Sequence, residues 1–150
     1  MSYTNLLYHI VFRTKSSRPA INVEHERDLY SYLFACIKNA GGVTHRIGGM
    51  PDHVHVLANI PPTISVADFM RNIKTATSVF LRSHPSEFPL FDGWGKSYCA
   101  LTYGKDERET IRRYIMNQKE HHKRVSFAEE LRCLLIEQGV EFDEKYFLSD

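Results

Sequence analysis

The feature that most constrains the fold is the stretch VTHRIGGMPDHVHVLANI, which occupies residues 43–60. Two runs rich in strand-forming residues flank the turn-forming Met-Pro-Asp at 50–52, so the stretch predicts a β-hairpin. Side chains alternate along a strand, and His53 and His55 therefore project from the same face of the second hairpin strand. The hairpin thus places two imidazole rings side by side on one face of a sheet.

The paired histidines have two interpretations at this point. A histidine on a strand is most often only hydrogen-bonded, and an isolated H-x-H pair is weak evidence for a metal. Alternatively, two neutral imidazoles on one face supply half of a metal site. The residues predicted to lie near the pair must distinguish these interpretations.

The remaining pattern predicts an α+β domain around the hairpin. Apolar periodicity, with Gly41-Gly42 and Pro61-Pro62 as breaks, defines the other elements. They are strands at 4–12, 43–49, 53–60 and 96–103, and helices at 23–40, from 66 onward, at 106–124 and at 126–138. The order β-α-β-β-α-β of the first six matches the ferredoxin-like split βαβ pattern. We therefore expect an antiparallel sheet with helices on one face plus an extra C-terminal helix.

Length and composition indicate a single domain over residues 1–150. The chain has 43% hydrophobic and 25% charged residues, which is ordinary for a globular protein. The apolar stretch NLLYHIVF is too short to span a membrane and no cleavage site follows it, so we expect a cytoplasmic protein without membrane contact. Three widely spaced cysteines argue against a disulfide framework and against a cysteine zinc site.

Charge is unevenly distributed along the chain. Residues 1–124 hold 17 Lys and Arg against 11 Asp and Glu, a net charge of +6. Residues 125–150 hold 2 against 7, a net charge of −5, and therefore form an acidic C-terminal helix and tail. The mildly basic body is compatible with binding to nucleic acid.

The predicted helix at 106–124 adds further chemical groups to the histidine pair. At 100° per residue, Tyr114, Gln118 and His122 fall within one stripe about 100° wide. Taken alone, Tyr114 is typical of a core aromatic residue and Gln118 of a surface flank. Combined with the strand histidines, the set could supply nitrogen ligands, an oxygen ligand and a nucleophile.

On these residues the chain resembles a known family, the IS200-like single-tyrosine transposases of the insertion sequence 200/605 group, which are HUH endonucleases. The resemblance covers most of the chain and rests on the segments YHIVFRTKSSRPAI, GGMPDHVHVLANIPP, NIKTATSVFLR, GWGKSYCALTYG and YIMNQKEHH. It implies that His53 and His55 are the paired histidines of the family. It also implies that Tyr114 is the nucleophile and that Gln118 completes the metal shell, and His122 is a further candidate.

The resemblance also implies an activity, a substrate and an assembly. Such enzymes cut and rejoin single-stranded DNA at element ends that bear hairpins, through a 5′-phosphotyrosine intermediate. Processing two ends with one nucleophile per chain predicts a homodimer, and the resemblance implies that the tyrosine helix of one chain can complete the histidine pair of the other. The residue types are consistent with cutting and rejoining, because attack by a tyrosine hydroxyl keeps a phosphoester bond from which the strand can be rejoined. Imidazole and amide ligands without thiolates suit Mg²⁺ or Mn²⁺.

Basic and aromatic side chains are candidates for contacts with DNA phosphates and bases. They are Arg13, Lys15 and Arg18 after the first strand, Arg71, Lys74 and Arg82 along one side of the second helix, and Trp94 in the loop that follows. The alternatives are that the basic residues form a solvated surface and that the tryptophan anchors its loop on the core.

Two other functions deserve comparison with a transposase. A domesticated relative would bind or cut chromosomal palindromic repeats without transposing them. A metal-dependent hydrolase of the H-x-H type would need a further ligand at strand spacing, which HVHVLANI lacks. Subterminal imperfect palindromes in the DNA that flanks the gene would distinguish a mobile element from a domesticated relative.

Overall fold

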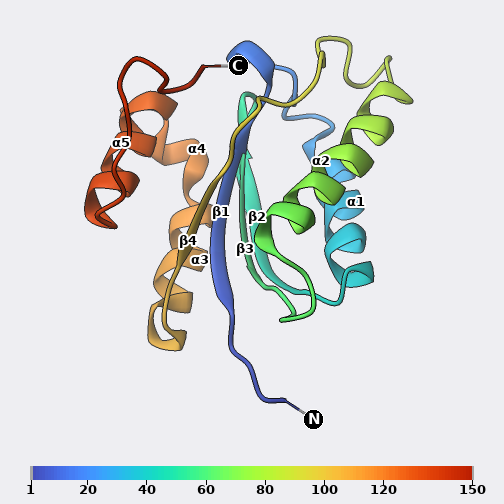
Figure 1. Ribbon diagram of the computed structural model, residues 1–150. Helices are drawn as coiled ribbons and strands as arrows, with labels where there is room; N and C mark the ends of the chain where they lie inside the picture. The colour runs from blue at the N-terminus through green and yellow to red at the C-terminus, as the bar shows by residue number, and fades with distance from the viewer. Residues whose placement is uncertain (1, 150) are drawn as a thin grey trace.

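The computed structural model describes residues 2–149, which contain one four-stranded antiparallel sheet with helices against both faces (Figure 1). The order across the sheet is β2-β3-β1-β4. The strands are β1 (Leu7–Arg13), β2 (Val43–Met50), β3 (His53–Asn59) and β4 (Cys99–Thr102). The predicted hairpin is formed by β2 and β3, and β3 pairs with β1 so that Val11 lies opposite His55.

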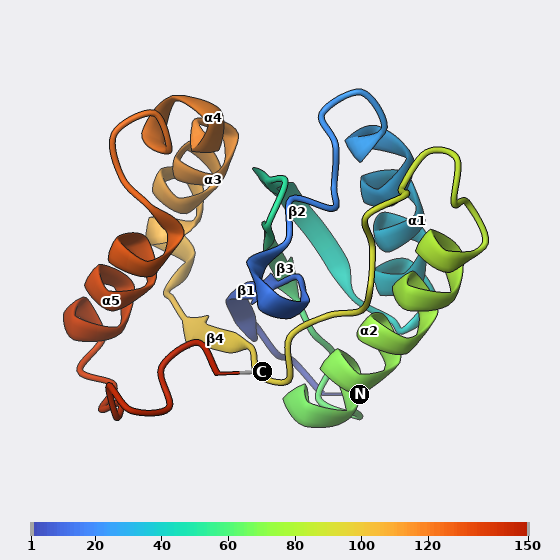
Figure 2. The ribbon, with the colours of Figure 1, turned by 90° about the horizontal axis from the view of Figure 1, so that it is seen from above.

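The helices divide between the two faces of the sheet (Figure 2). One face is covered by α1 (Glu26–Asn39) and α2 (Val66–Arg82), and the other by α3 (Arg108–Met116), α4 (Gln118–His121) and α5 (Phe127–Glu137). Single 3₁₀ turns, η1 and η2, occupy Lys15–Ser17 and Lys105–Glu107. The expected ferredoxin-like α+β fold is confirmed, with α1 and α2 together on one face and the additional C-terminal helices on the other. Within residues 2–149 no helix is long and apolar enough to cross a membrane.

Alternation along the two central strands supplies buried side chains to both faces. Ile10 and Phe12 of β1 join Val54 of β3 in the main core, which α1 and α2 complete. The residues between them point to the opposite face, where two smaller apolar clusters form around Val11 and Leu57. Because both faces are buried, the two central strands are rich in apolar residues, and the polar residues within them need partners inside the protein.

The helix predicted at 106–124 is interrupted in the structure. α3 ends at Met116, Asn117 has φ −93° and ψ 16°, and the separate turn α4 begins at Gln118. Asparagine favours such positions because its side chain competes with the backbone for hydrogen bonds within a helix. After the break Gln118 points inward and is only 1% exposed, so the alternative of a surface-flank position is wrong for this residue.

The tyrosine-bearing helix α3 packs on β2 at a position without a side chain. A Cβ atom added to Gly48 would lie 2.9 Å from the backbone oxygen of Ile115 and 2.9 Å from its Cγ2. Ile115 is buried in the cluster that includes Leu57 and Tyr114. The placement of Tyr114 therefore depends on a glycine in the neighbouring strand.

We expect Gly48→Ala to push α3 away from β2 and to lower the free energy of unfolding by about 1 to 3 kcal/mol, because a backbone carbonyl cannot move aside as a flexible side chain can. Urea unfolding measures this change, and hydrogen exchange should accelerate in residues 108–121. Gly104→Ala is the matched control, since its nearest neighbouring atom lies 3.7 Å away and its φ is −76°. Equal stability of the two variants would contradict this account.

Candidate active site and metal centre

The face of the sheet beneath α3, α4 and α5 holds a cluster of buried polar side chains. His53 and His55 of β3 are both 0% exposed, and His9 of β1 lies beside them. The predicted placement of the pair on one face is confirmed, because the apolar residues that alternate with them belong to the main core. Phe127 of α5 stacks on the His53 ring, with the ring centroids 4.3 Å apart. These imidazoles are therefore shielded from water.

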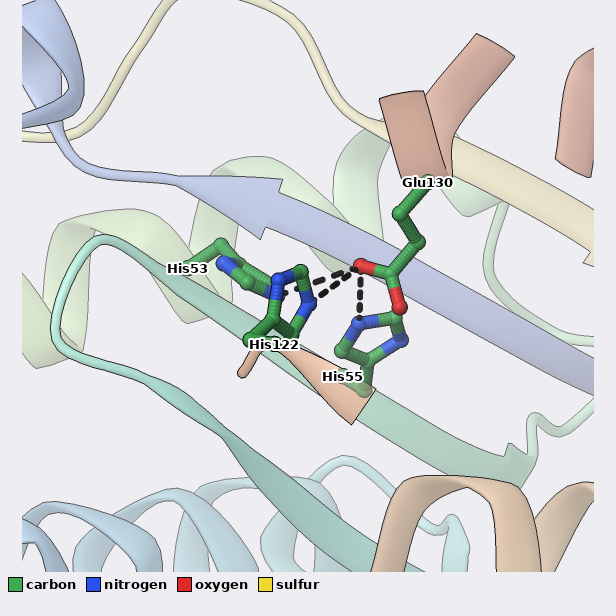
Figure 3. Close-up of side chains that lie close together, drawn as sticks. All are labelled: His53, His55, His122 and Glu130. Carbon is green, nitrogen blue, oxygen red and sulfur yellow. Dashed lines mark hydrogen bonds and ion pairs between the residues drawn. The ribbon is translucent and has the colours of Figure 1, made fainter. Parts of the chain in front are cut away.

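A carboxylate from α5 lies at the centre of the cluster (Figure 3). The Oε1 atom of Glu130 is 3.3 Å from Nε2 of His53, 3.1 Å from Nε2 of His55 and 3.0 Å from Nε2 of His122. One ligand atom from each of these four side chains lies within 4.8 Å of the others. Their separation suits a single metal ion.

The predicted nucleophile and amide reach the same carboxylate through its second oxygen. The Tyr114 hydroxyl donates a short hydrogen bond to Oε2 of Glu130, and Nε2 of Gln118 donates to Oε2 at 2.8 Å. The amide oxygen of Gln118 lies 3.1 Å from Nε2 of His53. The structure thus brings Tyr114, Gln118 and the histidine pair together within a single chain.

Each of the three histidines around Glu130 has a fixed partner on its other ring nitrogen. Nδ1 of His53 lies 2.7 Å from the Asp52 carboxylate, and Nδ1 of His122 lies 2.7 Å from a backbone carbonyl oxygen. Nδ1 of His55 lies 2.8 Å from Nε2 of His9. Such outer contacts orient imidazoles in metal sites, and here they direct every Nε2 atom toward the carboxylate.

Burial and the imidazoles determine the charges within the cluster. Burial acts to raise the pKa of Glu130, but hydrogen bonds with His122 and the strand histidines outweigh it and hold that pKa well below its usual range. Burial, followed by the charge of Glu130, raises the pKa of the Tyr114 hydroxyl well above its usual value. Burial also lowers the pKa of His55 to about 4. At neutral pH the carboxylate is therefore ionised, while the phenol and the His55 ring are neutral.

The candidate DNA contacts on α2 lie on the face of the sheet opposite the histidines. Lys74 donates to the backbone oxygens of residues 95 and 97, at 2.8 and 3.0 Å, and Arg82 lies over the ring of Phe91. Lys74 and Arg82 line a shallow groove together with Trp94. Arg71 is exposed and pairs with an aspartate of its own helix, at 2.6 Å.

The other candidate DNA contacts lie near the end of β1 and in the loop before β4. Arg13 is only 4% exposed and donates to the backbone oxygen of Leu148 at 2.6 Å, whereas Lys15 and Arg18 are exposed. The indole nitrogen of Trp94 donates to a threonine hydroxyl of α2 at 2.9 Å, and its ring packs against Phe12 in the core. Trp94 thus has the contacts of a loop anchor.

Sequence reasoning missed two members of the cluster, Glu130 and His9. Glu130 was included in the acidic C-terminal segment, although it lies three residues after Phe127 and four before Leu134, which are both buried. An acidic residue within an apolar helical stripe is a readable sign of a buried carboxylate. His9 gave a weaker signal, as a lone histidine in an apolar strand.

The fold and the cluster together define the class of the protein. A ferredoxin-like sheet with an H-x-H pair on a central strand and a tyrosine helix across that pair is the arrangement of a single-tyrosine HUH transposase. The chain belongs to the family described as "Transposase IS200 like", whose model matches residues 2–118. The match therefore includes His53, His55, Tyr114 and Gln118 and ends before His122 and Glu130. Members of this family are DNA-cutting enzymes.

Named relatives and solved structures agree with this assignment. The chain is 29% identical over 117 residues to the ISDra2 transposase TnpA of Deinococcus radiodurans, covering 75% of this chain and 84% of the relative. It is 31% identical over 123 residues to the transposase for insertion sequence element IS200 of Salmonella typhimurium, which covers 79% of this chain and 80% of that relative. A crystal structure of a candidate transposase from Deinococcus radiodurans superimposes with a TM-score of 0.62 at 29% identity. The superposition covers 78% of this chain and 93% of that structure. A REP-associated tyrosine transposase bound to a REP hairpin superimposes with a TM-score of 0.61 at 12% identity, over 83% of this chain and 73% of that structure. At this identity the likeness shows a shared fold alone.

The buried histidines predict a loss of stability in mild acid. Burial, with the charge of His55, lowers the pKa of His9 from 6.5 to about 3, so His9 stays neutral in the folded chain and gains a proton on unfolding below pH 6.5. The unfolded state then binds more protons, and the free energy of unfolding should fall with decreasing pH by about 1.4 kcal/mol per pH unit for this group. His9→Gln should remove about that part of the slope in urea unfolding with EDTA present. Identical slopes would assign the acid sensitivity to other groups.

Proposed function

We propose that this transposase cuts and rejoins single-stranded DNA at hairpin-bearing element ends, with Tyr114 as the nucleophile and a divalent metal ion as the cofactor. The observation that supports the proposal most directly is the convergence of the Tyr114 hydroxyl and the His53/His55 pair on one buried carboxylate. A nucleophile and metal-ligating groups that meet at one point are what metal-assisted phosphoryl transfer requires.

The tyrosine preserves the energy of the bond that it cuts. Its hydroxyl oxygen attacks the phosphorus, the bond from phosphorus to the 3′ oxygen breaks, and the products are a 5′-phosphotyrosine and a free 3′-hydroxyl. A second 3′-hydroxyl can reverse the reaction and join a different strand. The number of phosphoester bonds is unchanged throughout, so the reaction needs no ATP.

The cluster fits a divalent metal. His53 and His55 are buried imidazoles, and Gln118 and Glu130 present oxygen atoms beside them. Nitrogen and oxygen donors without thiolates suit Mg²⁺ or Mn²⁺, and imidazole favours Mn²⁺ of the two. When bound, such an ion polarises the scissile phosphate. Tyr114 itself must lose a proton that Glu130 and the buried surroundings stabilise.

Single-stranded DNA is the proposed partner, and the cytoplasm is the proposed location. The exposed cations Lys15, Arg18 and Arg71 are available to phosphates, and the groove of Lys74, Arg82 and Trp94 adds a second basic surface. Support for a hairpin substrate comes from the structural relative described as bound to a REP hairpin.

The alternative function is that of a domesticated relative, which binds or cuts chromosomal palindromic repeats without transposing them. The same structure favours it, because that protein is described as a REP-associated tyrosine transposase bound to a REP hairpin. Both functions use the same tyrosine chemistry. Inspection of the DNA that flanks the gene separates them, because only a mobile element needs subterminal imperfect palindromes at its own ends.

We further propose a homodimer, since one nucleophile per chain cannot process two element ends at once. Tyr114 lies beside the histidines of its own chain in the structure. The link from β4 to α3 includes Gly104, where the chain could turn so that the tyrosine helix reaches the histidine pair of a second copy. Exchange between these two arrangements would bring the two ends together.

We expect Tyr114→Phe to abolish strand cleavage and to leave binding of a hairpin oligonucleotide within a few-fold of the wild type, because only the nucleophilic oxygen is removed. Denaturing electrophoresis of a labelled single-stranded end detects the covalent protein–DNA adduct. Wild-type protein with EDTA is the control for the metal. An adduct that persists in Tyr114→Phe would assign the nucleophile to another residue.

Mixed dimers test the exchange of tyrosine helices. A heterodimer of a Tyr114→Phe chain with a His53→Ala chain contains one fully intact site if the helices cross between chains, and it should retain about half of the wild-type cleavage. If each chain uses its own tyrosine, every site has one defect. Purification through two different affinity tags, followed by the adduct assay, measures the outcome. A stable, DNA-binding heterodimer without activity would contradict the crossed arrangement.

A further inference from the structure

The side chain of Lys119 joins three elements that lie far apart in the sequence. Lys119 is the second residue of α4, and its Nζ atom donates to Oε2 of Glu26, the first residue of α1, at 2.8 Å. The same Nζ atom donates to the backbone oxygen of Gly49 in β2 at 2.5 Å. One ammonium group therefore connects the turn after the tyrosine helix with the edge of the sheet and with a helix on the opposite face.

The surroundings of this ammonium group differ from those of an ordinary surface ion pair. The Lys119 side chain is 40% exposed and that of Glu26 only 17%, and the Tyr30 hydroxyl holds the Glu26 carboxylate with a hydrogen bond of 3.2 Å. An exposed pair rarely offsets the entropy lost by a flexible lysine. Here a half-buried carboxylate and a backbone carbonyl accept two of the three ammonium hydrogens, so the side chain has a defined position.

Other ion pairs on the helices do not connect separate elements in this way. Pairs between residues three positions apart in the chain are formed by Arg71, Arg112 and Lys123. Such local pairs stabilise a turn of helix without docking it on anything. The contacts of Lys119 therefore concern the placement of α4 and not its formation.

The break between α3 and α4 explains why this placement needs a contact of its own. A continuous helix would carry the orientation of Tyr114 onward through residue 118, but the chain leaves the helical conformation at Asn117. Lys119 lies two residues after the break. Its acceptor Gly49 pairs in the β2–β3 hairpin with Val54, the residue between the two strand histidines. The hydrogen bond thus ties the segment after Tyr114 to the hairpin that holds the histidine pair.

We infer that Lys119 is a positioning residue for Tyr114, which holds the broken tyrosine helix in register with the hairpin of His53 and His55. The inference rests on the proposed role of Tyr114 as the nucleophile. In-line attack tolerates little displacement, and a misplacement of about 1 Å can cost about 100-fold in rate. Lys119 acts through the placement of α3 and α4, while its own ammonium group is engaged by Glu26 and Gly49.

The test is the rate of covalent adduct formation on a labelled single-stranded element end with Mn²⁺, measured over a range of DNA concentrations. Lys119→Met keeps an unbranched apolar stem and removes both donations, so kcat should fall at least about tenfold while KM stays within about twofold. Lys119→Arg keeps the charge and the N–H donors, and its kcat should stay within about threefold of the wild type. Far-UV circular dichroism and urea unfolding verify that each variant is folded.

Two further variants make the test specific to this contact. Arg112→Met is the matched control, because it breaks a 2.7 Å ion pair that stays within α3 and should leave kcat unchanged. Glu26→Gln removes the charge of the acceptor and should lower kcat in the same direction as Lys119→Met. If the two residues act as one unit, the double variant should be no slower than Lys119→Met alone.

The possible failures are distinguishable. If folded Lys119→Met forms the adduct at the wild-type rate, the inference is wrong and Tyr114 remains the proposed nucleophile. A rise in KM at unchanged kcat would make Lys119 a contact for DNA and would equally overturn the inference. If the wild type itself forms no adduct, the proposed role of Tyr114 fails, and the inference fails with it.

Discussion

A single buried carboxylate connects the parts of this site. Glu130 is ionised yet 3% exposed, and a buried charge persists only where partners replace its lost hydration. Those partners come from β3, from α3 through Tyr114, from α4 through Gln118 and from the following turn through His122. The docking of α5 and the orientation of the tyrosine are therefore not independent, because both depend on the same side chain.

The sequence was sufficient for the framework and for half of the site. Strand alternation predicted the hairpin and the common face of His53 and His55, since a period of two depends only on local geometry. The positions of Tyr114 and Gln118 came from helical periodicity, although the helix breaks between them. Glu130 was not found because its role depends on where α5 packs, which brings it to strand histidines such as His55, 75 residues away in the chain. Periodicity predicts that a residue is buried, but it does not predict which residues it will contact.

Two charged residues lie where the charge pattern of the sequence does not predict them. The acidic C-terminal segment reads as a solvated tail, yet one of its carboxylates is the most buried charge in the candidate site. Likewise Arg13, expected on a basic surface, lies under the C-terminal segment and contacts Leu148. Both side chains are thus buried, although the sequence assigns them to charged surfaces. The net charge of a segment predicts a class of partner, whereas the role of an individual charged residue can be assigned only from its place in the fold.

The site consists of two parts that are joined by the short link at residues 103–107. The sheet part holds the His53/His55 pair, and the helical part holds Tyr114 together with His122 and Glu130. Side-chain contacts hold the helical part in place, such as the 2.5 Å hydrogen bond from Lys119 to the backbone oxygen of Gly49 in β2 and the 2.8 Å ion pair between Lys119 and Glu26 of α1. In the proposed crossed homodimer the helical part would dock in the same way on the second copy and assemble the same atoms from two chains. Because Glu130 and His122 lie on the same part as Tyr114, both arrangements would bring these three side chains to the histidine pair as one unit.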